Sequence, residues 1–328
     1  MNNKAGPLSD GKPAPTFPES GLDDIAAAFQ IDGQPVRGRI VRMGKETVDP
    51  ILRRHDYPEP VAALVGEAVA LVALIGSAMK VTGRMILQAE GNGPVSFVVA
   101  EYRADEGQGA GGVRGYAKLD REKFDAAFGA RPPRRANIKS LLGEGAFSMT
   151  LDQSDEMERY QGVTPLDGEH LSDCAENYFL QSEQIPTRIM LAIAEAYVAG
   201  DAPYWRAGAA LLQRMADDDA RGGGEAAWEE ALAKFETTGA DELTDPTLTA
   251  DRLLFRLFHE QGVRLAAAQA LDERCTCNAE RLIAILSRFS AEELSDMREA
   301  DGGIHARCEF CGRSYDLPDP FADGSGAH

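Results

Sequence analysis

The stretch Val81–Leu119, VTGRMILQAEGNGPVSFVVAEYRADEGQGAGGVRGYAKL, sets the expected fold class. Runs rich in β-branched and aromatic residues alternate here with breaks rich in glycine. This pattern is typical of strands joined in antiparallel hairpins. The chain around it mixes further strands and helices without a regular β-α-β rhythm. We therefore predict an α+β core, residues 21–216, in which helices pack on an antiparallel sheet.

Further strands of the core are predicted from the same β-rich composition. They cover Pro35–Gly44, Gly145–Gln153, and the stretches PTRIMLAIAEAYV and WRAGAALLQRM around a loop at Gly200–Pro203. A helical stretch is predicted at Gly168–Gln184.

One apolar run, Val61–Met79, is 19 residues long and could just span a bilayer. It contains Glu67, however, and its many alanine and glycine residues lower its hydrophobicity. We interpret it as a buried core helix and expect no contact with a membrane.

The overall charge excludes several classes of partner. The chain carries a net charge of −19, from 34 basic and 53 acidic residues. Such a surface repels nucleic acid and anionic lipid.

Residues 1–20 are rich in Pro, Gly and Ser and lack an apolar core, so they predict a disordered arm, not a secretory signal. The expected location is the cytoplasm, where thiols stay reduced and close cysteines indicate metal or redox chemistry.

Residues 217–262 differ from the core and are predicted to form a helical linker. Ten acidic and two basic residues lie between Asp217 and Asp245. Two helical patterns occur in the linker, and each has a single apolar stripe that needs a partner surface. The alternative is a helical hairpin that belongs to the core itself. The residues expected in the linker–core contact are Trp228, Phe235, Leu254 and Phe258.

Residues 263–328 hold four of the five cysteines, in the pattern Cys275-x-Cys277 and Cys308-x-x-Cys311. Side chains at i and i+2 of an extended segment point to the same side, and a Cys-x-x-Cys turn brings both sulfurs together. Gly312 can adopt the positive φ that such a turn often needs. Four thiolates suit a tetrahedral Zn²⁺, one per chain, although iron is also compatible with sulfur ligation. The alternative is four unrelated thiols.

The intervening residues predict a small fold around this site. Asn278 is expected to cap a helix whose apolar stripe is Leu282, Ile285, Leu286 and Phe289. Ser290 opens a capping box, and IHARCEFCGRSYDL predicts a hairpin. So small a core is marginal, and a structural zinc ion contributes ~10 kcal/mol or more of folding free energy.

The same thiolates are the groups that oxidants attack. A bridge between Cys275 and Cys277 would close a very small, strained ring, which a reductant could open again. The local chemistry therefore suggests a switch in which oxidation displaces the metal and the segment loses structure.

Other candidate sites are weaker. GQGAGG at Gly107–Gly112 matches a nucleotide-binding glycine pattern, but a strand and not a helix is expected after it. His305 is interpreted as an ordinary hairpin side chain, and Cys174 as a buried free thiol. A closed four-cysteine site leaves no open metal position, and the five histidines are scattered, so we expect no enzymatic activity. From Val263 onward the chain has seven Arg but twelve Asp and Glu, and this negative balance argues against nucleic-acid binding.

The chain resembles the redox-regulated holdase chaperones of the heat-shock protein 33 (33 kDa chaperonin) family. The four-cysteine pattern is the family hallmark, and the likeness extends over about residues 21–320. The N-terminal arm, the Gly107–Gly112 loop and the start of the linker look expanded. The other segments that resemble the family are GPVSFVVAEY, VRGYA, RYQGVTPL, YFLQSEQIPTR, LLFRLFHEQGV and GIHARCEFCGRSYDL.

The resemblance implies an α+β core, a metastable linker and a zinc-binding redox switch. It implies that the reduced, zinc-bound form is inactive. Oxidation would form disulfides Cys275–Cys277 and Cys308–Cys311, release zinc and loosen the linker. Unfolding client proteins would then bind without ATP, and dimerisation would accompany activation. The competing hypothesis is a protein-binding module whose zinc is purely structural.

Overall fold

The computed structural model describes residues 23–79, 82–104, 109–153, 159–215, 224–299 and 303–317. The predicted arm at residues 1–20 lies outside these ranges, as do most of the acidic start of the linker and part of the Gly107–Gly112 loop.

Eleven strands form one sheet in the order β7-β6-β3-β4-β5-β11-β1-β2-β9-β8, with β10 paired to β1. All of these pairings are antiparallel except that of β11 with β5. The predicted antiparallel α+β core is therefore confirmed. The strands are β1 (Ile25–Ile31), β2 (Val36–Met43), β3 (Gly83–Gly91), β4 (Val95–Ala104), β5 (Gly111–Leu119), β6 (Gly145–Asp152), β7 (Tyr160–Pro165), β8 (Thr187–Ala196), β9 (Tyr204–Arg214), β10 (Val263–Leu265) and β11 (Gln269–Glu273).

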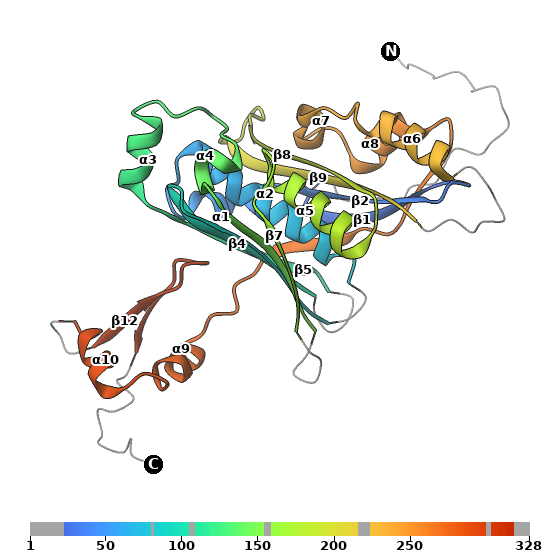
Figure 1. Ribbon diagram of the computed structural model, residues 1–328. Helices are drawn as coiled ribbons and strands as arrows, with labels where there is room; N and C mark the ends of the chain where they lie inside the picture. Colours follow the sequence, from blue (N-terminus) through green and yellow to red (C-terminus); the bar gives the residue numbers. More distant parts are fainter. Residues whose placement is uncertain are drawn as a thin grey trace.

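Helix α2 (Glu59–Gly76) lies at the centre of the core and is almost wholly buried. It contacts β4 and β5 on one side and β2, β8 and β9 on the other, so the curved sheet surrounds it (Figure 1). Among the described residues it is the one helix long and apolar enough to cross a membrane, and 83% of it is buried inside the protein. The Glu67 carboxylate, in a residue only 9% exposed, lies 3.6 Å from Nδ1 of His170. The prediction of a buried core helix is confirmed.

Shorter helices complete the core around α2. The helix predicted at Gly168–Gln184 is present as α5 (Leu171–Tyr178), continued by one π-helical turn, Phe179–Glu183. The others are α1 (Val48–Arg53), α3 (Arg121–Phe128) and α4 (Ile138–Leu142).

The linker helices α6 (Gly224–Phe235), α7 (Ala240–Thr244) and α8 (Ala250–Phe258) pack on the sheet face opposite α2 (Figure 1). Successive side chains of a strand point to opposite faces, so β1 places Ala26 against the α2 side and its neighbours against the linker. We call the apolar residues of this second face the linker-covered face: Ile25, Ala27, Phe29, Ile31, Val36, Ile40, Ala210 and Leu212.

The strands β10 and β11 correct one predicted boundary. The sequence places the C-terminal domain from Val263 onward, but β10 pairs with β1, and β11 pairs with both β1 and β5. Residues 263–273 therefore belong to the core sheet. Their pairing partners are distant in the sequence, so local composition did not reveal them.

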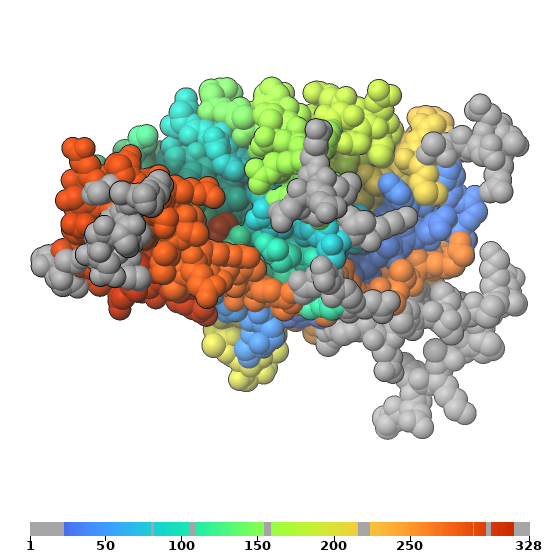
Figure 2. Space-filling model, turned by 90° about the horizontal axis from the view of Figure 1, so that it is seen from below, coloured from blue at the N-terminus to red at the C-terminus, as the bar shows by residue number. Residues whose placement is uncertain are grey.

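The C-terminal segment contains α9 (Ala279–Leu286), α10 (Ala291–Asp296) and the hairpin of β12 (Ile304–Arg307) and β13 (Ser314–Leu317). Its buried apolar residues are only Leu286, Leu294, Ile304 and Leu317 among those described. It lies beside the core sheet in Figure 1, and in Figure 2 the orange and red segment covers one end of the molecule.

Candidate metal centre

Two short segments carry the four cysteines. Cys275 and Cys277 follow β11, where the amide of Arg274 donates to the carbonyl of Val113 at 2.9 Å. Helix α9 begins directly afterwards, and the Asn278 side chain caps it by accepting from the amide of Arg281, as predicted. The first pair is thus fixed between a strand of the core sheet and a capped helix.

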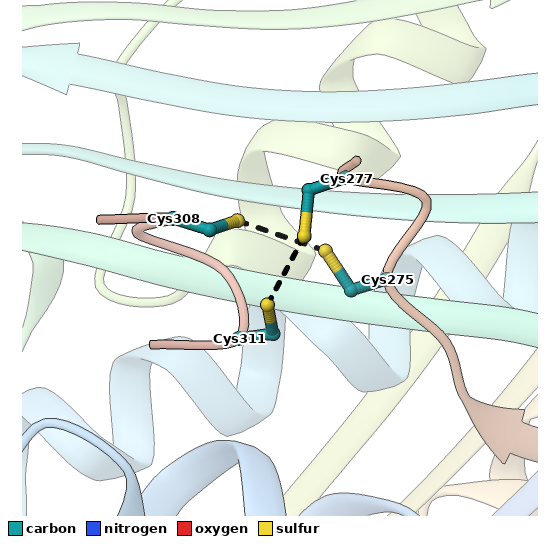
Figure 3. Close-up of side chains that lie close together, drawn as sticks. All are labelled: Cys275, Cys277, Cys308 and Cys311. Carbon is teal, nitrogen blue, oxygen red and sulfur yellow. Dashed lines mark hydrogen bonds between the residues drawn. The ribbon is translucent and has the colours of Figure 1, made fainter. Parts of the chain in front are cut away.

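The second pair lies in the turn between β12 and β13. The amide of Cys308 donates to the carbonyl of Arg313 at 2.9 Å. The amide of Gly312 donates to the carbonyl of Cys308 at 2.7 Å. Gly312 has a φ of +67°, as the sequence led us to expect. This backbone turn directs both sulfurs toward the first pair (Figure 3).

The four Sγ atoms lie within 4.8 Å of one another. The Sγ atoms of Cys277 and Cys311 are 3.3 Å apart, and those of Cys275 and Cys308 are 3.7 Å apart. A tetrahedral zinc ion with Zn–S bonds of about 2.3 Å would place its sulfurs about 3.8 Å apart. The donor set and its spacing therefore fit a closed four-thiolate metal site.

The surroundings make the four thiols chemically unequal. Burial opposes the ionisation of Cys277, but hydrogen bonds from Tyr315 and the neighbouring thiols outweigh it and lower its pKa to about 7. The Tyr315 hydroxyl lies 3.1 Å from that sulfur. Burial raises the pKa of Cys311 to about 12. A lowered pKa favours the thiolate form of Cys277, the form in which a cysteine binds a metal or reacts.

The predicted apolar stripe of α9 needs one correction. Leu286 is buried, and Leu282 and Phe289 pack beside it, but Ile285 is 51% exposed. Ile283 packs against the cluster instead. This helix is only two turns long and lies against a narrow hairpin, so it buries a narrower side than a regular stripe suggests.

The four residues predicted to form the linker–core contact pack against the linker-covered face of the sheet. Phe235 and Phe258 are fully buried, Leu254 is 1% exposed and Trp228 is 9% exposed. The ring of Phe258 stacks on Phe29 of β1, with 6.1 Å between the ring centroids.

Two buried arginines of the sheet also hold the linker, and they were missing from the sequence prediction. Arg42 donates to the carbonyls of Glu242 and Asp245, and Arg206 donates to that of Thr244 at 2.8 Å. Both side chains are at most 1% exposed. The linker contact is therefore apolar at α6 and α8, and at α7 it adds hydrogen bonds from buried arginines to backbone carbonyls.

Other residues near the metal centre are likewise missing from the sequence prediction. Arg114 and Tyr116 of β5 and Arg54 of the core contact the turn that bears Cys308 and Cys311. The alternation of buried and less buried residues along β5 places Arg114 and Tyr116 on one face. Strand alternation could have placed the two side chains on one face, but it does not identify the segment that covers them.

Cys174 lies apart from the other thiols, and we expect it to be unreactive in the folded protein. It is fully buried, its Sγ donates to the carbonyl of Asp167 at 3.5 Å, and burial raises its pKa to about 11. At pH 8 only about one thousandth of it would be thiolate. When a chelator removes the metal, iodoacetamide should modify the other four cysteines. Cys174 should react only after a denaturant is added. Peptide mass mapping can show both results. Modification of Cys174 in the folded protein at the rate of Cys275 would contradict this.

Comparison with known proteins agrees with the fold. The family model described as Hsp33 protein matches residues 24–318. The 33 kDa chaperonin of Caulobacter vibrioides is 51% identical over 306 residues, which cover 93% of this chain and 98% of that protein. That of Enterobacter sp. is 35% identical over 280 residues, covering 85% and 87%. The crystal structure of the Thermotoga maritima 33 kDa chaperonin has the same fold, with a TM-score of 0.68 at 23% identity over 90% of this chain and 95% of that one. The chain therefore belongs to the Hsp33 family.

Proposed function

We propose that this protein is an ATP-independent holdase chaperone that oxidation switches on. Its relatives are named 33 kDa chaperonins, which supports a chaperone role. The observation that carries the proposal is a connection within the fold. Strand β11 pairs with β1 of the linker-covered face, and two residues after it the chain reaches Cys275. A change at the thiols can therefore reach the surface that the linker covers.

In the reduced state we assign one zinc ion per chain to Cys275, Cys277, Cys308 and Cys311. When bound, zinc supplies cross-links between two segments that share only a small apolar cluster. Under oxidation, Cys275–Cys277 and Cys308–Cys311 form disulfides. For each, two thiolates lose two electrons to one peroxide molecule, which takes up two protons from the solvent and becomes two water molecules. Disulfide sulfurs are not thiolates, so the metal can no longer be held.

The consequence for the linker follows from what it covers. We assign residues 21–216 and 263–273 to the chaperone core, 217–262 to the linker and 274–328 to the redox switch. Release of the linker would expose the linker-covered face and the apolar sides of α6 and α8 together. Large exposed apolar patches bind unfolded chains or a second copy of the protein. We therefore propose unfolding proteins as clients, and a dimer as the activated form, in the cytoplasm.

A combined measurement tests the proposal. Peroxide with mild heat is expected to release about one zinc ion per chain, read with a chromophoric chelator. The treated protein should then suppress light scattering by an aggregating client, and a thiol reductant with zinc should reverse this. The same protein kept reduced is the control. Zinc release without any gain of anti-aggregation activity would favour a purely structural zinc site instead.

A further inference from the structure

The turn that carries two of the metal-binding cysteines rests directly on the core. Phe310, between Cys308 and Cys311, places its ring edge-on to Tyr116 of β5, with 4.7 Å between centroids and an interplanar angle of 78°. The guanidinium carbon of Arg114 lies 4.1 Å from the centroid of the same ring. The backbone carbonyl of Phe310 accepts a hydrogen bond from Nη1 of Arg54 at 2.8 Å. Side chain and main chain of one residue are therefore both held by the core.

Arg114 also reaches the other cysteine pair. Its Nη1 lies 3.6 Å from Sγ of Cys275 and donates a hydrogen bond to it. Its Nη2 lies 2.7 Å from Oε2 of Glu101, which fixes the guanidinium, and the Arg114 side chain is only 13% exposed. One core residue thus contacts both halves of the site, a thiol of the first pair and the turn of the second.

We propose that Arg114 is a positioning residue of the metal centre, and that Arg114 and Phe310 together form a direct link between the metal site and strand β5. This inference rests on the proposed zinc site, and it adds a route to the core that does not pass through the linker. The link holds while the Cys308–Cys311 turn keeps the shape that points both sulfurs at one ion. Pairing these sulfurs in a disulfide would reshape the turn and withdraw Phe310 from Tyr116.

The charges explain why an arginine suits this position. Four thiolates around a divalent zinc ion leave a net charge of −2. The positive charge that reaches Cys275 is that of Arg114, which donates to its sulfur, whereas Arg103 pairs with the other carboxylate oxygen of Glu101. A hydrogen bond from a cation to a ligand sulfur favours the thiolate that binds the metal. Loss of such an outer partner typically lowers metal affinity by about 10- to 100-fold.

The test measures zinc release from the full-length, reduced protein to a chromophoric chelator. Arg114→Met, which keeps much of the side-chain volume, is expected to release zinc about 10-fold faster than the unsubstituted protein. Arg103→Met is the matched control, because Arg103 pairs with the same Glu101 at 3.4 Å. It should release zinc at the unsubstituted rate. Hydrogen exchange should also show weaker protection of the Cys308–Cys311 turn in Arg114→Met alone.

A second variant covers a possible failure to fold. If Arg114→Met lacks the thermal unfolding transition of the core, Phe310→Ala decides, because Phe310 lies outside the core sheet. It too should release zinc several-fold faster. Equal release rates in the deciding variant and the unsubstituted protein would overturn the inference. Purified protein that holds no zinc at all would overturn the proposed function itself, which metal analysis of the starting material distinguishes.

Discussion

Replacing Cys308 with serine is expected to abolish tight zinc binding and to unfold the C-terminal segment while the core stays folded. The reason is that its described apolar cluster has only four buried residues. So small a core is marginal by itself, whereas a structural zinc ion contributes about 10 kcal/mol or more of folding free energy.

Metal analysis and hydrogen exchange measure the two parts of this result. Zinc should fall from about one per chain to near zero, and the amides of α9, α10 and the β12–β13 hairpin should lose protection. The amides of α2 and β4 should keep theirs. Glu309→Gln is the control, because this exposed residue lies in the same turn and offers no sulfur. A Cys308→Ser protein that retains both its zinc and the protection of its hairpin would show that the segment folds without the metal.

The sequence predicted those parts of the fold whose signal is local. Helix α2 covers most of a long apolar run whose one charged residue is Glu67, and the hairpin of β3 and β4 has its glycine break between two β-rich runs. The cysteine pairs carried their geometry in their spacing. Gly312 showed where the turn would need a positive φ, and the structure has it there.

The remaining parts depend on pairing between distant segments. Strand β11 joins β1 to β5 and so makes one continuous sheet, yet its sequence, QALDE, has no strand character. Arg42 and Arg206 are charged residues buried in the sheet, where they donate to backbone carbonyls of residues 242–245. Arg206 is also paired with Asp23. Burial and then the nearby charge of Arg206 lower the pKa of Arg42 to about 10. Composition alone could not place a linker over two arginines.

Replacing Phe258 with alanine is expected to give a protein that suppresses client aggregation while still reduced and zinc-bound. Phe258 of α8 is fully buried against the linker-covered face, where its ring stacks on that of Phe29. Truncating such a side chain costs about 3–5 kcal/mol. The arginine contacts at α7 oppose release less than their number suggests, because both guanidinium groups regain water when the linker leaves. Apolar packing by α6 and α8 therefore decides whether the linker stays in place.

The control is Phe255→Ala, since Phe255 lies on the same helix and is 38% exposed. It should leave the reduced protein inactive. Light scattering of an unfolding client gives activity, and hydrogen exchange of α6 and α8 reports whether the linker has been released. Combining Phe258→Ala with Phe235→Ala should strengthen both effects, because the two residues pack in the same apolar cluster.

If the linker helices lose protection in Phe258→Ala but the reduced protein remains inactive, linker release is not sufficient, and the thiols must act on the core by another route. The contact of Phe310 with β5 is then the route to examine, since it joins the cysteine turn to the sheet without the linker.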